Sequence, residues 1–500
     1  MDRRGFLCRA AGLLLASPPL TALVGACTRA TSTSTATTSA PPTAPPTSGP
    51  PRIPWDELAA GLHGRLIRPG TPGYPVARLA YDPRFDDIRP RAIVMTTTTG
   101  DVARTIRFAR DHGLPFAARC GGHSYGGYSL SDGIVIDVSE MATIRTGAGT
   151  ATVGAGAKVI DVAASFASAG SVIPAGTCPT VGISGLTLGG GQGIVGRRFG
   201  LTCDSLRAAR VVLADGRVVS CDASRQADLF WALRGAGGGN LGVVTSFTFA
   251  SHPLSAITAF SMSWPWSDAT DVVAAWQRWG PSAPAPLWSS CRLRWIPGTG
   301  PSVSVSGAWS GPPSGLARHL DELASASRHA PSRSTVTLSL LDAARYFAGC
   351  SSYSIDDCRL TEQGGLLMRE GSLAKSDFFD RSIDADVIRA ALGLIEARGA
   401  TTALAAQTAG VLFDAWGGTI ADVAADATLR TNRRWLTNLW RAFRPAASGA
   451  AYVNYIDPEL RDWLRAYYGD NLARLVDVKR RYDPDDAFRF AQSIPTTLPS

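Results

Sequence analysis

Three glycine-rich stretches in the first half of the chain constrain its fold more than any other feature. They occupy residues 119–127, 176–193 and 235–242. Glycine lets backbone amides approach a ligand closely and curl into a concavity that binds anions. No stretch shows the GxGxxG pattern opening a helix after a first strand, with an acidic residue about 20 positions on, that a Rossmann site requires. The stretches therefore predict a ligand site of another kind.

Two nucleophilic side chains, His123 and Cys178, lie within these stretches. An electron-poor flavin ring can trap an imidazole or a thiol, so the pair predicts one flavin held at two points. Each residue also has an ordinary interpretation. His123 would be a turn histidine bonded to backbone groups, and Cys178 would be a small buried hydrophobe.

Apolar periodicity predicts a βα unit that feeds the first glycine-rich stretch, followed by further strands. After His252 the glycine-rich stretches cease, and alternating strands and helices indicate a separate α+β unit that supplies the substrate face. The chain then returns through 452–455. The predicted helices are 101–112, 226–234 and 471–481, and the predicted strands are 116–118, 134–138, 151–159, 206–213, 218–221, 243–249, 259–264, 303–309 and 334–341.

Charge and cysteine usage exclude some functions. The net charge of +8 is scattered, with no basic stripe of the kind that binds nucleic acid. No CxxC or HxxxH spacing indicates a metal, so no metal site is expected. Cys350 and Cys358 are close enough in sequence for a local disulfide in an oxidising compartment, whereas the spacing of Cys203 and Cys221 decides nothing.

The N-terminal residues indicate processing. Arg3 and Arg4 precede an apolar stretch in residues 1–27, as in a twin-arginine export signal. Residues 24–27 also match a lipoprotein cleavage box, in which Cys27 would carry the lipid; the alternative is cleavage near Ala26 and release. Residues 28–52 are almost entirely Thr, Ser, Ala and Pro, which predicts a disordered tether. We expect an exported protein, anchored at the cell surface or secreted, whose fold begins near Ile53.

Several segments in order resemble the berberine bridge enzyme-like oxidoreductases of the vanillyl-alcohol oxidase, or PCMH-type FAD-binding, superfamily. The resemblance covers residues from about 85 to 495. The segments that carry it are RCGGHS at 119–124, GTCPTVG at 176–182, GGGQG at 189–193, RRFGL at 197–201, DLFWALRG at 228–235, YVNY at 452–455 and QSI at 492–494.

The resemblance implies an α+β protein with a PCMH-type FAD-binding domain in two parts and an inserted α+β substrate domain, an antiparallel sheet flanked by helices. The expected bounds are 53–253 and 451–500 for the FAD-binding parts and 254–450 for the insert. His123 would attach to the flavin 8α carbon and Cys178 to C6, which makes the FAD bicovalent. Backbone groups expected to cradle the pyrophosphate or line the flavin belong to Arg119, Gly121, Gly122, Ser124, Gly182, Gly189, Gly190, Gly193, Gly242 and Val243.

Catalysis needs a proton acceptor as well as the flavin, which takes the hydride. The resemblance implies Tyr452, on a strand that faces the substrate, with Tyr455 as the alternative and a packing role for either as the third interpretation. Because a strand alternates faces, both cannot point the same way without a twist or bulge. Val181 matches a family position where a small valine admits oxygen, which favours an oxidase.

Two departures from the family concern the proton network and the substrate side. Gln192 stands where plant members often carry a tyrosine, and residues 429–433 lack the Phe-Pro-His-Arg stretch that many members have. Trp416, Trp435 and Trp440 suit stacking on a sugar or aromatic ring, or ordinary core packing.

Three functions remain at this level. The leading one is an exported FAD-dependent oxidase that converts an alcohol or sugar hemiacetal to a carbonyl or lactone and reduces oxygen to hydrogen peroxide. Its partners would be a small-molecule substrate and oxygen. The second is a secondary-metabolite tailoring oxidoreductase that passes electrons to another acceptor. The third is a non-catalytic surface-binding scaffold.

Overall fold

The computed structural model describes residues 53–371, 374–379, 381–400, 406–420, 443 and 446–499. From Ile53 onward the chain forms one compact unit. The expected export signal, Cys27 and the tether lie outside the described residues, as do Trp435 and Trp440. No helix that the structure describes is long and apolar enough to cross a membrane.

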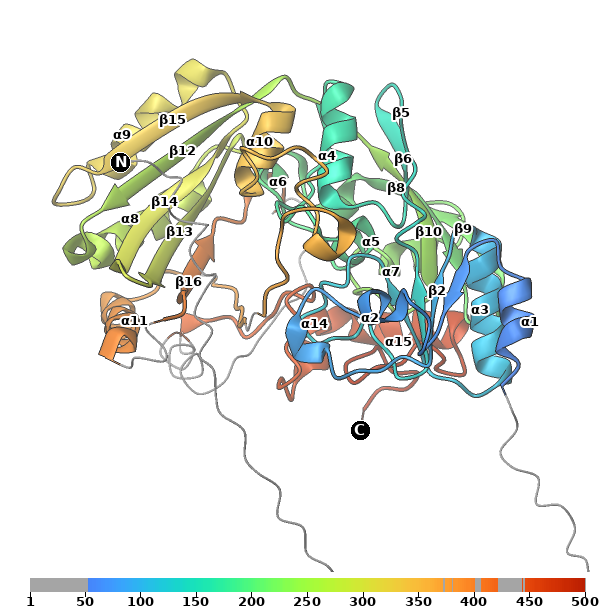
Figure 1. Ribbon diagram of the computed structural model, residues 1–500. Helices are drawn as coiled ribbons and strands as arrows, with labels where there is room; N and C mark the ends of the chain where they lie inside the picture. Colours follow the sequence, from blue (N-terminus) through green and yellow to red (C-terminus); the bar gives the residue numbers. More distant parts are fainter. Residues whose placement is uncertain are drawn as a thin grey trace, which may run out of the picture. The chain divides into compact units, whose positions relative to one another are not determined.

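A four-stranded mixed sheet, ordered β1-β2-β4-β3, begins the fold (Figure 1). Helix α3 (Thr99–Asp111) connects β2 to β3 and starts at a capping box, because Thr98 and Asp101 each bond the other's backbone. Its apolar face, which includes Val102 and Ile106, is buried. The strands are β1 (Arg65–Ile67), β2 (Ala92–Met95), β3 (Phe116–Arg119) and β4 (Ile134–Asp137).

A five-stranded antiparallel sheet follows, ordered β5-β6-β10-β8-β9. The strand expected at 151–159 is too long: β6 ends at Gly154, and Val159 begins helix α4 (Val159–Ser168). Gly156 passes so close to the Val138 carbonyl that a Cβ there would lie 2.0 Å from its oxygen, so the chain turns off the sheet. The strands are β5 (Ile144–Thr146), β6 (Thr150–Gly154), β8 (Leu206–Val212), β9 (Val218–Asp222) and β10 (Val243–Ala250).

The second antiparallel sheet, here called the substrate sheet, has the order β15-β12-β14-β13-β16. Its buried face packs against helices α8 (Ala269–Ser282), α9 (Ala317–Ala324) and α11 (Ala385–Ala397), whose apolar residues form one core with it. Figure 1 shows these helices beside the sheet. The strands are β12 (Ala256–Trp264), β13 (Leu287–Ile296), β14 (Gly300–Trp309), β15 (Ser332–Ser339) and β16 (Ala409–Asp414).

The end of the chain returns to its beginning. Helices α14 (Trp463–Tyr468) and α15 (Leu472–Tyr482) share a hydrophobic core with α1 (Trp55–Ala60), α3 and the first two sheets (Figure 1). The α+β class is thereby confirmed, while the expected domain bounds at 253/254 and 450/451 stay a prediction. The remaining named elements are α2 (Tyr74–Ala77), β7 (Ser171–Val172), α5 (Ile183–Leu188), α6 (Gly196–Phe199), α7 (Ala227–Ala232), β11 (His252–Pro253) and α10 (Leu340–Phe347).

Residues 452–455 form a turn, so the expectation of a strand there is wrong. The Tyr455 amide donates to the Tyr452 carbonyl over 2.9 Å, and this bond closes the turn. A strand would place side chains three apart on opposite faces. The turn instead brings the two tyrosine rings together, with centroids 5.2 Å apart.

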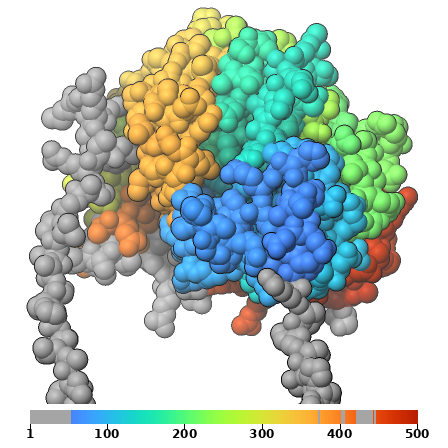
Figure 2. Space-filling model, turned by 45° about the vertical axis from the view of Figure 1, so that its right-hand side comes forward, coloured from blue at the N-terminus to red at the C-terminus, as the bar shows by residue number. Residues whose placement is uncertain are grey.

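Helices α4 and α10 pack against each other and join the substrate sheet to the glycine-rich stretches. In Figure 2, the orange segment that contains α10 lies against the teal segment that contains α4. Cys350 and Cys358, just after α10, form a disulfide, as their spacing indicated. Cys203 and Cys221 are buried free thiols.

Candidate active site

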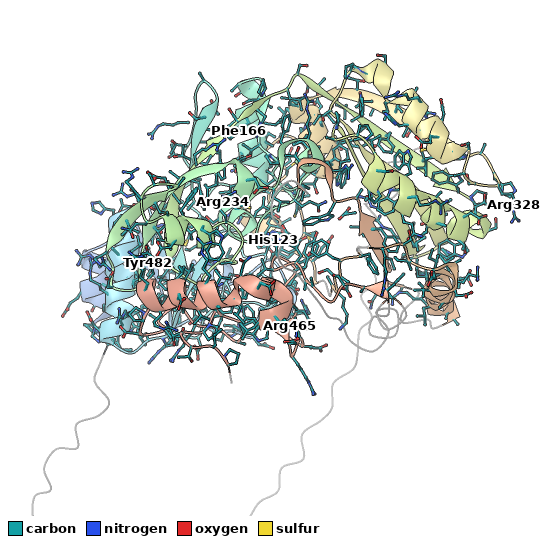
Figure 3. All side chains as sticks on the ribbon, turned by 180° about the vertical axis from the view of Figure 1, so that it is seen from behind. His123, Phe166, Arg234, Arg328, Arg465 and Tyr482 are labelled. Atoms are coloured by element: carbon teal, nitrogen blue, oxygen red, sulfur yellow. A yellow bond between two sulfur atoms is a disulfide. The ribbon has the colours of Figure 1, made fainter. Side chains whose placement is uncertain are left out.

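His123 and Cys178 are brought together by Thr180. The Thr180 hydroxyl lies 2.9 Å from His123 Nε2 and 3.9 Å from Cys178 Sγ. Figure 3 shows His123 in the interior of the molecule. Cys178 has an exposed side chain. One hydroxyl therefore links the two candidate attachment residues, which lie far apart in the sequence.

Two neighbours set the state of His123. The ring of Tyr81 stacks on it with centroids 3.8 Å apart. Burial lowers the pKa of His123 to about 3, and the nearby ammonium of Lys158 adds to the effect. The imidazole is therefore neutral at physiological pH. Since Nε2 contacts Thr180, Nδ1 is the ring nitrogen that remains for a bond to the cofactor.

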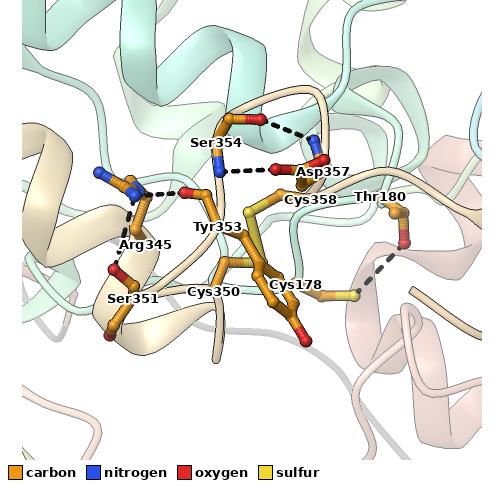
Figure 4. Close-up of a disulfide and its surroundings, with 9 residues drawn as sticks. All are labelled: Cys178, Thr180, Arg345, Cys350, Ser351, Tyr353, Ser354, Asp357 and Cys358. Carbon is orange, nitrogen blue, oxygen red and sulfur yellow. Dashed lines mark hydrogen bonds between the residues drawn. A yellow bond between two sulfur atoms is a disulfide. The ribbon is translucent and has the colours of Figure 1, made fainter. Parts of the chain in front are cut away.

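The surroundings of Cys178 differ from those of a free surface thiol. Desolvation by the surrounding protein raises the pKa of the Cys178 thiol, while its contacts with Thr180 oppose the rise. The loop between Cys350 and Cys358 is here called the disulfide loop. In Figure 4 the ring of Tyr353, from this loop, extends toward Cys178. Arg359, directly after Cys358, pairs with Asp161 of α4 over 3.1 Å. This pair holds the disulfide loop against α4.

The first two glycine-rich stretches touch each other directly. A Cβ on Gly121 would lie 2.3 Å from the Gly182 amide nitrogen, and one on Gly182 would lie 2.1 Å from Cys120 Sγ. Only glycines permit this approach. Helix α4 holds the second stretch from behind, because the amides of Val159 and Ile160 donate to the carbonyls of Val181 and Pro179.

Arg119 and Ser124 use their side chains within the protein. The Arg119 guanidinium pairs with Asp137 over 2.6 Å and donates to carbonyls of the 77–79 segment. The Ser124 hydroxyl accepts the Tyr128 amide over 3.1 Å. Their expected part in the pyrophosphate cradle therefore rests on their backbone.

The remaining residues expected to line the flavin adopt backbone conformations that allow a ligand or another segment to come close. Gly190 has φ +105° and Gly242 has φ +151°, both unfavourable for any other residue. A Cβ on Gly189 would collide with the Asn454 amide, and one on Gly193 with the Ala175 carbonyl. Val243 is the first residue of β10 and is buried.

Polar atoms without partners at these loops fit a flavin. Gln192 Nε2 and Thr187 Oγ1 are buried and bond no described atom. A flavin carries ring carbonyls and nitrogens that such groups can bond, and a buried donor without a partner costs about 1–3 kcal/mol. The residues present therefore fit FAD at the glycine-rich stretches.

The two tyrosines named as candidate bases lie at these loops. The Tyr452 hydroxyl accepts bonds from the Gly191 amide over 2.8 Å and from Asn454 Nδ2 over 3.0 Å. Burial nevertheless holds the pKa of Tyr452 above its usual value. Tyr455 stacks on Tyr125, two residues after His123, with centroids 5.6 Å apart. Burial and the charge of Asp414 hold the pKa of Tyr455 well above normal.

Asp414 is a functional candidate that sequence reasoning missed. It ends β16, and burial raises the pKa of its carboxyl to about 6, which the charge of Arg292 opposes. Its carboxyl makes no hydrogen bond to another described side chain, and it is electrostatically coupled to Tyr455. A lone acidic residue closing the apolar run AGVLF at 409–413 was the available signal. A carboxylate of this kind can accept a proton at neutral pH.

Among the described residues, no group of three or more His, Cys, Asp or Glu side chains is placed to hold a metal ion. The glycine-rich stretches would hold an FAD that supplies redox chemistry, and Asp414 would accept a proton beside it. This combination is typical of a flavin-dependent oxidoreductase.

Comparison with known protein sequences assigns the chain to one family. Residues 90–222 match the FAD binding domain family, and residues 451–495 match the berberine and berberine-like family. A Bacillus subtilis protein, the uncharacterized FAD-linked oxidoreductase YgaK, is 34% identical over 87% of this chain and 97% of its own length. The chain belongs to the berberine bridge enzyme-like FAD-linked oxidoreductases.

Two further relatives bear on the fold and the substrate. Chitooligosaccharide oxidase from Gibberella zeae is 28% identical over 83% of this chain and 89% of its own. The structure of Physcomitrella patens BBE-like 1 superimposes with a TM-score of 0.73 at 29% identity, covering 89% and 99% of the two chains. The PCMH-type FAD-binding fold with an inserted substrate domain is thereby confirmed.

Proposed function

We propose that this chain is an exported FAD-dependent oxidase that oxidises an alcohol or sugar hemiacetal and reduces oxygen to hydrogen peroxide. The observation that carries the proposal is Asp414, a carboxyl with a raised pKa beside Tyr455 and the loops of His123 and Cys178. A sugar hemiacetal is favoured because the relative from Gibberella zeae is named for oxidising chitooligosaccharides.

The protein groups have distinct tasks in this reaction. FAD, when bound, takes the hydride from the substrate carbon and passes the two electrons to oxygen. The Asp414 carboxylate accepts the hydroxyl proton, directly or through Tyr455, as the carbon–oxygen double bond forms. Tyr452, whose hydroxyl already accepts two hydrogen bonds, donates to and orients the substrate oxygen.

Bicovalent attachment through His123 and Cys178 is part of the proposal. Neutral His123 has an available ring nitrogen, and Thr180 contacts both residues. We expect acid-precipitated wild-type protein to stay yellow, each single alanine variant to retain its flavin, and only the double variant to release it fully. Free FAD from precipitated wild type would show that neither bond exists.

Oxidation by oxygen is supported by Val181, whose small side chain stands at the family's oxygen position on a loop held by α4. The decisive experiment is an anaerobic screen of sugars, alcohols and phenolics for bleaching of the flavin, followed by admission of air. An oxidase recovers its colour within the mixing time and forms one hydrogen peroxide per turnover. Flavin that stays reduced in air and reoxidises with a quinone would instead indicate a dehydrogenase.

Export, and a lipid on Cys27, remain proposals from residues 1–27. Expression in a host with a twin-arginine system tests them. The mature protein should appear outside the cytoplasm, and Cys27→Ala should shift it from the membrane fraction to the medium. Retention of the precursor in the cytoplasm would contradict the proposal.

A further inference from the structure

The two faces of the substrate sheet differ sharply in chemistry. One face carries large apolar residues that pack under α8, α9 and α11. Residues paired across strands share a face, so the register identifies the members of the other face. Ser290 of β13 pairs with Asp414 of β16 and with Ser306 of β14, and Ser306 pairs with Ser261 of β12.

This second face, here called the polar face, is made largely of hydroxyls and charges. Arg292 and Arg294 follow Ser290 at alternate positions on β13 and pair with Ser304 and Ser302. The serines of the polar face are Ser261, Ser263, Ser290, Ser302, Ser304, Ser306, Ser332 and Ser334. Apart from Ser290, these side chains are half-buried or exposed. Helix α10 covers one end of this face, where Ile257, Trp288 and Ala308 form a core with Leu340 and Ala343.

Neither arginine on the polar face makes an ion pair with a residue that the structure describes; the charge of Asp414 acts on Arg292 only at longer range. Arg292 Nη1 donates to Ser306 Oγ over 2.6 Å, while Arg292 Nε is buried without a partner. Arg294 makes no ion pair with any residue that the structure describes. Desolvation lowers the pKa of both guanidinium groups, and Arg292 lowers that of Arg294 further. Two adjacent cations with unused donors fit a bidentate carboxylate.

The cationic pair begins close to the proposed proton acceptor. Since Ser290 pairs with Asp414, a strand rise of about 3.3 Å per residue puts Arg292 about 7 Å and Arg294 about 13 Å along β13 from that pair. A substrate whose reacting carbon lies at Asp414 therefore extends over serine hydroxyls toward two guanidinium groups.

We propose that the polar face recognises a carboxylate-bearing sugar, with Arg292 and Arg294 binding the carboxylate and the serines bonding the sugar hydroxyls. The inference rests on the proposed function, because it names the substrate class of the same site. Asp414, a single acidic residue, lies at the reacting end of the face. An anionic group therefore binds along β13, away from Asp414.

Methyl glycosides test this recognition, because their anomeric carbon carries a methoxy group and no hemiacetal remains to be oxidised. Binding of methyl β-D-glucuronide and methyl β-D-glucoside to the FAD-loaded protein is measured by calorimetry at low and high salt. We expect the glucuronide to bind at least about 10-fold more tightly, because charge-assisted hydrogen bonds to its carboxylate are stronger than neutral ones. The preference should shrink as salt rises.

Arg294→Gln should bring the two affinities to within about 2-fold of each other, since it removes one charged partner, and Arg294→Lys should restore part of the preference. The matched control is Arg333→Gln, on β15 of the same sheet. Arg333 alternates with Ser332 and Ser334, lies on the helix side and pairs with Asp321 of α9. This variant should keep the wild-type preference.

Equal affinity for the two glycosides, no binding of the glucuronide, or a preference that survives Arg294→Gln would each overturn the inference. A different measurement, reduction of the flavin by sugars, tests the proposed function. If no sugar reduces the flavin, the oxidase proposal fails, whereas the comparison of the blocked glycosides still decides the inference.

Discussion

Thr180 occupies an unusual position at the scale of single residues, because its hydroxyl contacts both candidate attachment residues. We therefore expect Thr180→Val to lower the fraction of covalently bound flavin. The substitution keeps the side-chain shape but leaves His123 Nε2 without its partner, a cost of about 1–3 kcal/mol. The fraction is measured as colour retained after acid precipitation, and Thr180→Ser should restore it. Wild-type retention in Thr180→Val would contradict a positioning role.

Asp414 gives the site a pH dependence whose direction follows from its pKa. A carboxyl with a pKa of about 6 is protonated below that pH and cannot accept a proton there. We expect kcat/KM to rise through pH 6 and to level off above it. Asp414→Asn should lower the rate by about 10²–10⁴-fold, the usual contribution of general base catalysis, and remove this rise. An unchanged profile in Asp414→Asn would assign the titration to another group.

Helix α4 provides the test at the scale of elements. Its first amides, from Val159 and Ile160, hydrogen-bond to the loop of Cys178 (residues 178–182, here called the cysteine loop). Val159 is the first helical residue, and Lys158 before it is extended with φ −88° and ψ 153°, which suits a following proline. Val159→Pro should therefore keep the helix but lose the bond from the Val159 amide to the Val181 carbonyl.

We expect Val159→Pro to destabilise the cysteine loop by about 1 kcal/mol. The largest effect should be on the proposed covalent bond between Cys178 and the flavin. It is measured as the flavin released by acid precipitation when His123→Ala is combined with Val159→Pro. Val159→Ala, which keeps the amide and loses only packing, is the control. Equal release from both combinations would show that the amide bond does not position Cys178.

At the scale of the whole molecule, Lys479 joins the end of the chain to the third glycine-rich stretch. It is fully buried, pairs with Asp483 over 2.7 Å and Asp486 over 3.0 Å, and donates to the carbonyls of Asn240 and Phe488. This is how α15, near the C-terminus, holds a loop expected to line the flavin.

Lys479→Met should lower the free energy of unfolding by about 3–5 kcal/mol, because it leaves the buried Asp483 carboxylate without its cationic partner. Denaturant unfolding of the FAD-loaded protein measures the change. Arg480→Met, at an exposed position on the same helix, should stay within about 1 kcal/mol of wild type. Comparable losses in the two variants would exclude a special role for Lys479.

The local pattern of residues was sufficient for the cofactor side of this protein. Glycines around His123 and Cys178 permit a close backbone approach to a ligand. Alternating or helical spacing of apolar residues located most strands and helices. The turn at 452–455 was missed because a short aromatic run is compatible with a strand, and only the bond from the Tyr455 amide to the Tyr452 carbonyl defines it.

The sequence by itself predicted the flavin cofactor, because the candidate attachment residues His123 and Cys178 and their glycines are neighbours in the chain. Only the tertiary structure decided the substrate side. Asp414 has a raised pKa because strands and loops from distant segments bury it, and the polar face exists because register aligns serines and arginines from four strands. Burial and register depend on contacts between residues far apart in sequence, which no local pattern encodes.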